Sequence, residues 1–158
     1  MTVYVPSGAV PAAPRFAVDV PADWVAGASA GAMVMFQIAD RPAWSVVVSS
    51  LRVGADTTLR DVAVRTFARQ RQQHPDAQIR VQRTGRFGTR LTYLREVALP
   101  APSGDRPLAQ FHAMFVVPAG STEFGDVMSI AATCPDGELS QLGPAVVEMV
   151  SSLRLEER

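Results

Sequence analysis

The chain has no lysine and no asparagine, and its 158 residues include one cysteine and two histidines. Lysine and asparagine codons are AT-rich, so their absence predicts a bacterial source with a high-GC genome. Every basic side chain apart from histidine is therefore arginine, which stays charged and binds carboxylates through two parallel hydrogen bonds. The single cysteine, Cys134, excludes an internal disulfide. Its apolar neighbours in the sequence favour a buried, unreactive thiol.

An excess of charge and a long apolar run are both missing. Fifteen basic residues balance fifteen acidic ones, so we predict no broad basic surface for nucleic acid. The apolar runs are far shorter than the roughly 18 residues of a membrane-spanning helix. The segment 1–6 does not have the pattern of a signal peptide, and no cysteine near it would accept a lipid. We therefore expect a cytoplasmic protein without a membrane span.

Motifs for catalysis and metal binding are scarce. The sequence holds no glycine-rich phosphate-binding motif, no nucleophile elbow and no histidine or cysteine pair at metal-ligand spacing. Acidic pairs such as Asp19 and Asp23 fall near expected turns and indicate solvated surface. We accordingly predict no catalytic residue, no metal site and no cofactor. The histidine in an expected strand, His112, is interpreted as a hydrogen-bonded sheet residue, with a role as base or ligand as the alternative.

The composition that remains is that of one folded domain, because 47% of the residues are apolar and only 19% are charged. We interpret residues 1–15 as an irregular, proline-bearing N-terminal arm and residues 16–158 as a single domain. Alternating and β-branched patterns predict strands at 16–20, 33–39, 44–53, 79–87, 90–99, 108–117 and 126–134. Turns or loops are expected at 21–24, 26–32, 40–42, 86–89, 100–107 and 118–125.

Two helices complete the expected elements. Thr58 and Asp61 form a weak capping box at the start of a helix over 58–73, and Pro75 stops it. The second helix is expected at 143–153, because Pro144 belongs in a first turn. Residues expected in the core are Val18, Val46, Val48, Leu59, Val62, Phe67, Phe115, Val146, Met149, Val150 and Leu153. The order of elements predicts an α+β fold, with an antiparallel sheet of six to seven strands sandwiched by helices.

Arginines gather in the middle third of the chain. They are Arg60, Arg65, Arg69, Arg71, Arg80, Arg83, Arg86 and Arg90. Binding of nucleic acid or of another anionic surface is one interpretation. The interpretation we prefer is a solvated face in a chain that uses no lysine, because no aromatic residues accompany the arginines to stack against bases.

The strand expected at 108–117 has two different faces. One is uniformly apolar and is expected to face the core, whereas the other mixes polar groups with methionine. The neighbouring strand offers a similarly mixed set. We predict a partner-binding face from these residues, with methionine as the adaptable apolar contact: Gln110, His112, Met114, Thr92, Leu94 and Glu96. The alternative is that a helix, or the second subunit of a homodimer, covers this face.

The segment Phe16–Trp24, with its Pro-x-x-Trp turn, resembles the opening strand of the PsbP/Mog-like α/β/α sandwich superfamily. The helix led by Thr58, the hairpin segment 85–90 and the final strand and helix over 128–155 are similar to that superfamily too. The resemblance covers about residues 16–155. It implies a non-enzymatic binding or assembly module.

Two branches of the superfamily resemble the chain. The LpqN-like lipoproteins are linked to envelope lipid transport through protein partners. The Eag-type chaperones are cytoplasmic and shield apolar helices of type VI secretion effectors. The rival class is a small-molecule-binding protein or enzyme, in which residues distant in sequence, such as Glu96 and an arginine, would form a pocket around His112.

Overall fold

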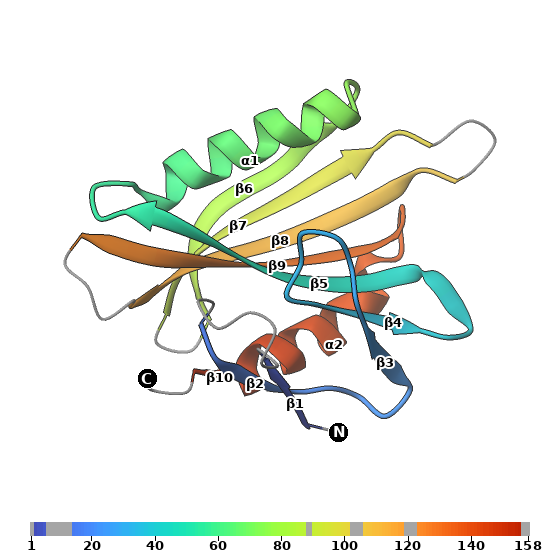
Figure 1. Cartoon of the computed structure of the whole chain (residues 1–158). Coiled ribbons are helices and arrows are strands. Elements are labelled where there is room, and N and C mark those ends of the chain that lie inside the picture. Colours follow the sequence, from blue (N-terminus) through green and yellow to red (C-terminus); the bar gives the residue numbers. More distant parts are fainter. Residues whose placement is uncertain (1, 6–13, 88–89, 102–105, 119–122, 156–158) are drawn as a thin grey trace.

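A seven-stranded antiparallel sheet with helices on both faces forms the centre of the computed structural model. The structure describes residues 2–5, 14–87, 90–101, 106–118 and 123–155. The strand order is β3-β4-β5-β9-β8-β7-β6. Helix α1 lies over one face of the sheet, and α2 lies under the other beside a small sheet of order β1-β2-β10 (Figure 1). This is the α+β sandwich that the sequence predicts.

The elements alternate in the order that the sequence predicts, with three short strands added. Their bounds are β1 Thr2–Val5, β2 Phe16–Asp19, β3 Trp24–Gly27, β4 Val34–Ile38, β5 Arg41–Gly54, α1 Leu59–Gln73, β6 Gln78–Phe87, β7 Arg90–Leu99, β8 Leu108–Pro118, β9 Phe124–Pro135, α2 Leu139–Ser152 and β10 Arg154–Leu155.

The main core fills the space between the sheet and α2, together with β2. Every core residue predicted for this side is buried: Val18, Val46, Val48, Phe115, Val146, Met149, Val150 and Leu153. They share one side because side chains alternate along a strand and directly paired residues point the same way. Pairs such as Val46 with Ala132 therefore build one continuous apolar layer.

Helix α1 begins with the capping box that the sequence predicts. The Thr58 side chain accepts a hydrogen bond from the Asp61 backbone at 3.1 Å, and the Asp61 carboxylate accepts one from the Thr58 backbone at 2.9 Å. Of the three core residues predicted on α1, Val62 is buried, whereas Leu59 and Phe67 are only partly buried. Phe67 packs against a small cluster that includes Val97, and the Arg95 guanidinium lies over its ring, 5.2 Å from the ring centre.

Helix α2 begins at Leu139, one turn earlier than predicted, and Pro144 lies inside it. Proline has no N–H, so the carbonyl of Ser140 loses its helical hydrogen bond. Both Ser140 and Pro144 are exposed, and water can satisfy that carbonyl. The extra turn buries Leu142 completely, and this burial offsets the cost of an interior proline.

Three short strands depart from the expectations. Trp24–Gly27 forms β3 where a turn and loop were expected, because its backbone pairs with β4. Thr2–Val5 forms β1 within the expected irregular arm, and β10 was not foreseen. The expected turns and loops at 86–89, 100–107 and 118–125 include residues 88–89, 102–105 and 119–122, which lie outside the described residues.

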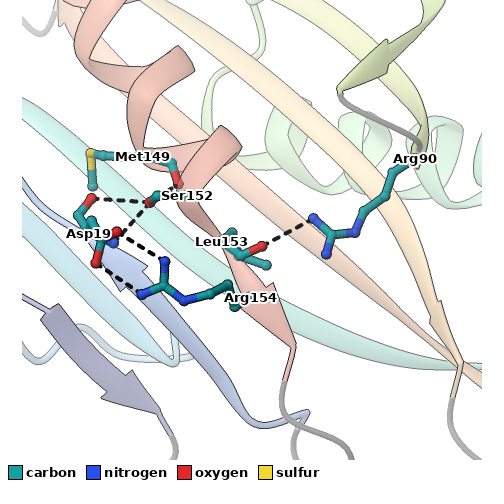
Figure 2. A network of polar contacts seen from close by, with 6 residues as sticks. All are labelled: Asp19, Arg90, Met149, Ser152, Leu153 and Arg154. Carbon is teal, nitrogen blue, oxygen red and sulfur yellow. Dashed lines mark hydrogen bonds and ion pairs between the residues drawn. The ribbon is translucent and has the colours of Figure 1, made fainter.

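Polar contacts join β2, near the start of the domain, to β10 and to the end of α2 (Figure 2). Arg154 donates two hydrogen bonds of 3.0 Å to the Asp19 carboxylate, and the Asp19 backbone donates one of 2.9 Å to the Ser152 hydroxyl. Arg90 donates to the carbonyl of Leu153 at the end of α2, over 3.3 Å. These contacts hold the last turn of α2 and β10 against β2 and the start of β7. Among the described residues, no helix is both long enough and apolar enough to cross a membrane.

Candidate functional site

The six residues predicted as one partner-binding face lie on opposite faces of the sheet. Thr92, Leu94 and Glu96 pair directly with Phe115, Ala113 and Phe111 of β8. Their side chains therefore point toward α2, whereas those of Gln110, His112 and Met114 point toward α1. The register between the two strands, which neither strand fixes alone, thus divides the six residues between the two faces of the sheet. Their role in partner binding stays a prediction.

The half of the predicted face on β8 is covered by α1. Met114 is fully buried and packs with Val62 and Ala63 of that helix. The alternative reading, that a helix covers this face, is therefore confirmed for Met114 and its two polar neighbours. Met114 could meet a partner only if α1 moved away, whereas Gln110 and His112 are partly buried.

A polar cluster lies beneath α1, centred on the side-chain amide of Gln110. Its oxygen lies 2.6 Å from the amide nitrogen of Gln70 and 2.6 Å from Nε2 of His112, and its nitrogen donates to the Thr133 hydroxyl at 2.8 Å. Because the amide oxygen only accepts, His112 must carry a proton on Nε2. The cluster thus joins α1, β8 and β9.

The second nitrogen of His112, Nδ1, lies 3.4 Å from the Arg95 guanidinium, which only donates. Nδ1 is therefore an acceptor and the ring is neutral. Burial, and then the nearby charge of Arg95, lower the pKa of His112 to about 3. No ion pair joins a carboxylate to His112 within the described part of the chain. With both nitrogens engaged and the protonated form disfavoured, this histidine is poorly placed for acid–base catalysis.

Arg95 links the sheet to α1. Its side chain is 1% exposed and donates hydrogen bonds to the Ala63 carbonyl at 2.6 Å and to the Thr66 hydroxyl at 3.4 Å. Burial lowers the pKa of this guanidinium. No carboxylate among the described residues forms an ion pair with it. Its hydrogen bonds go instead to a carbonyl and a hydroxyl of α1. The role that this geometry supports is positioning of α1.

The single cysteine, Cys134, is not activated by its surroundings. Cys134 is buried, and burial, followed by the nearby carboxylates Glu138 and Asp136, raises the pKa of its thiol to about 11. The thiol is therefore protonated at neutral pH and a weak nucleophile. In the described ranges, no three histidine, cysteine or acidic side chains converge as metal ligands would.

A groove of about 370 Å³ lies on the α2 face of the sheet, between that helix and strands β6 to β8. It exists because α2 packs mainly on β2, β8 and β9, which leaves the β6–β7 side of this face open. Its lining residues are Arg83, Leu94, Glu96, Phe111, Ala132, Leu139, Ser140, Leu142, Gly143, Val146 and Val147.

The groove is apolar inside and charged at one side. Apolar side chains from β7, β8 and α2 supply most of its lining, whereas Arg83 and Glu96 are the charged groups. Val147 on its helical wall is 49% exposed, and Val81, directly paired with Glu96, is 50% exposed. Single exposed valines are ordinary, but an exposed valine that lines an apolar hollow is typical of a binding surface.

Only Leu94 and Glu96 of the predicted site residues line this groove. Residues such as Arg83, Phe111 and Val147 were missed as site residues, because the groove joins segments that are distant in sequence. One signal was present in the second helix: Val147 is an apolar residue outside the buried stripe. The other signal of a groove is Gly143, a small residue one helical turn before Val147.

A second hollow, of about 470 Å³, lies at the far end of the sheet beside Trp44. Its lining includes Asp23, Asp40, Arg41 and Gln141, so it is largely polar. Trp44 itself is buried, donates to Glu138 at 2.8 Å and has the Arg41 guanidinium over its ring. These contacts explain Trp44 as a structural residue, and the lining of this hollow is more polar than that of the groove.

Comparison with known proteins gives structural relatives only. No protein-family model matches the sequence, and no curated protein matches it. The fold is similar to that of LpqN, a protein involved in cell envelope biogenesis of Mycobacterium tuberculosis, with a TM-score of 0.68, 18% identity and coverage of 99% of this chain and 91% of that one.

Two further solved structures are similar. Cyanobacterial PsbP from Synechocystis gives a TM-score of 0.68 at 13% identity, covering 98% of this chain and 92% of that chain. The Saccharomyces cerevisiae Ran-binding protein Mog1p gives 0.58 at 15% identity, covering 98% and 95%. The sheet order, the two helices and these likenesses together show that the chain has the PsbP/Mog-like α/β/α sandwich fold.

Proposed function

We propose that the chain is a non-enzymatic binding module that holds an apolar ligand or an apolar part of a protein partner in the groove beside α2. The observation that carries the proposal is the groove itself, an open hollow with an apolar lining and an exposed valine on its helical wall. Ligand sites are typically concave and mostly apolar, with a few polar groups at the side.

The likeness to LpqN supports an LpqN-like role, in which the module assists envelope lipid transport or secretion through a protein partner. The groove equally supports the chaperone alternative, in which it shields an apolar segment of a type VI secretion effector in the cytoplasm. Both roles need an apolar recess that releases its occupant, which an open groove provides. The enzyme alternative around His112 has less support, since that ring is neutral and both its nitrogens are engaged.

A matched pair of variants tests the groove. Val147 and Val64 are both exposed valines on helices, but only Val147 lines the groove. With the neutral apolar dye N-phenyl-1-naphthylamine as probe, we expect the wild-type protein to enhance dye fluorescence. Val147→Asp should weaken dye binding about fivefold or more, as a charge in an apolar wall costs at least ~1 kcal/mol. Val64→Asp should leave dye binding unchanged. No enhancement, or equal losses in the two variants, would contradict the proposal.

A further inference from the structure

The outer edge of β6 is the long free edge of the large sheet. Strand β6, over Gln78–Phe87, is the last in the order and pairs on its inner side with β7. The strand at the opposite edge, β3, has only 4 residues, whereas β6 has 10. Among the described strands β6 pairs only with β7, and its side chains from Gln78 to Thr84 are all exposed, so the described part of the chain leaves this edge open. A free strand edge presents unpaired backbone groups to which another strand can add.

Most of this edge is regular enough to receive a strand. The pairing with β7 runs without interruption from Val81 to Phe87, and the single irregularity lies between Ile79 and Val81. Arg80 is the extra residue at that irregularity, and its guanidinium is held by Asp136 at 2.7 Å and by Glu96 at 3.5 Å. The irregular end is thus neutralised, and the regular stretch beyond it remains available.

The charge of β6 selects the occupant. The strand contains three arginines and no acidic residue. Arg83, in the middle of the regular stretch, forms no ion pair with any described residue. It points to the α2 side of the sheet, as does Val81 two residues earlier, and Val81 is 50% exposed. An added strand would therefore place an acidic side chain beside Arg83 and an apolar one beside Val81.

We propose that the outer edge of β6 docks an extended acidic segment of a protein partner, which adds to the sheet as a further strand. Backbone hydrogen bonds supply the affinity of such strand addition, and alternate side chains supply its specificity. A second copy of this chain is a poor occupant, because pairing two β6 edges brings arginines of both copies together without acids between them. Arg83 also lines one side of the groove, but this proposal rests on the open backbone edge of β6 and does not depend on the proposed function.

The probe for this proposal is a synthetic peptide of 10 residues, the length of β6. Every second residue is threonine, and the positions between are occupied in turn by valine and glutamate. We expect it to bind and to slow hydrogen exchange of backbone amides between Val81 and Phe87. Arg83→Glu should weaken binding about tenfold or more, because an attractive charge pair becomes a repulsive one. The same variant should gain affinity for the matching peptide with lysine in place of glutamate. Arg69→Glu, an exposed arginine on the outer side of α1, is the control and should bind as wild type.

A backbone N-methylated version of the glutamate peptide separates strand addition from attraction by charge alone. It keeps the side chains and loses N–H donors, so we expect it not to bind. Equal binding of the methylated peptide, equal losses in Arg83→Glu and Arg69→Glu, or unchanged exchange in β6 would overturn the proposal. Dimerisation in place of peptide binding, measured by sedimentation, would overturn it as well. The apolar dye reports on the groove, whereas exchange in β6 and the methylated peptide report on the edge, so failure of the groove and failure of the edge are distinguishable.

Discussion

At the scale of single residues, the polar cluster beneath α1 shows how burial changes the meaning of a side chain. His112 is the kind of residue that suggests a catalytic base, yet both its nitrogens are hydrogen-bonded and the nearest charge is the positive Arg95. The cluster joins α1 to the sheet through Gln70, Gln110 and Thr133. Its chemistry is that of a structural network, in which the neutral histidine is required.

A pH dependence follows from His112. The folded-state pKa is about 3, below the ordinary value of 6.5. As the pH falls below 6.5 the unfolded chain takes up a proton that the folded chain refuses, so stability present above pH 6.5 is lost toward pH 3. By about pH 4.5 this loss should reach ~2–3 kcal/mol, at ~1.4 kcal/mol per pH unit.

Urea unfolding measured between pH 7 and pH 4.5, just above the ordinary pKa values of about 3.9 for aspartate and about 4.3 for glutamate, checks this expectation. The free energy of unfolding of the wild-type protein should fall across that interval. His112→Gln removes the titrating group, so the variant should show a flatter dependence whatever its stability at pH 7. An equally steep dependence in the variant would mean that another group is responsible.

At the scale of elements, α2 departs from ordinary helix chemistry where it borders the groove. Gly143 and Pro144 are the two residues least favourable inside a helix, and they lie next to each other within it. Gly143 is not in the left-handed region, where glycine is favoured. A side chain added there would meet open space, because no atom lies within 4 Å of the position of its Cβ. The glycine is therefore not explained by backbone conformation or by close packing.

Gly143→Ala should accordingly stabilise the protein by about 0.5–1 kcal/mol, the usual preference for alanine over glycine inside a helix. Thermal and urea unfolding measure this gain. The larger variant Gly143→Leu should keep the fold and lower binding of the apolar dye, because its side chain lines the groove. Destabilisation by Gly143→Ala would show that this glycine is needed for the helix itself.

At the scale of the whole molecule, the two helices are held by different forces. Helix α2 lies on the main core and buries Leu142, Val146, Met149 and Val150. Helix α1 buries only Val62 and Ala63, and much of its contact with the sheet is polar. Two buried polar atoms at that contact, Nε of Arg95 and Oε1 of Gln70, have no hydrogen-bond partner, and such groups cost ~1–3 kcal/mol each.

We therefore expect α1 to open from the sheet more readily than α2. In native-state hydrogen exchange, the amides of α1 should exchange through a local opening whose free energy is at least ~2 kcal/mol below that of α2 and β9. The difference should persist at several denaturant concentrations, as expected for a cooperative local unit. Equal protection of both helices would indicate that the polar cluster holds α1 as firmly as the core holds α2.

The sequence by itself determined the local elements. The capping box of Thr58 and Asp61, the alternation in strands such as β8 and the apolar stripe of α2 depend on neighbours within a few residues, so their periodicities are visible in the chain. The order of these elements was also sufficient to predict an antiparallel sheet between helices. The start of α2 was predicted too late, because Pro144 was expected only in a first turn. The burial of Leu142, which offsets the cost of an interior proline, is a tertiary effect that the sequence does not show.

Only the tertiary structure decided which residues share a surface. Pairing of β7 with β8 placed Leu94 and Glu96 on the face opposite Gln110 and His112, and a shift of one residue would have reversed this. The groove likewise depends on how far α2 extends across the sheet, which is fixed by packing between segments that are distant in the chain. Local patterns determine the faces of each element, and long-range pairing determines what those faces meet.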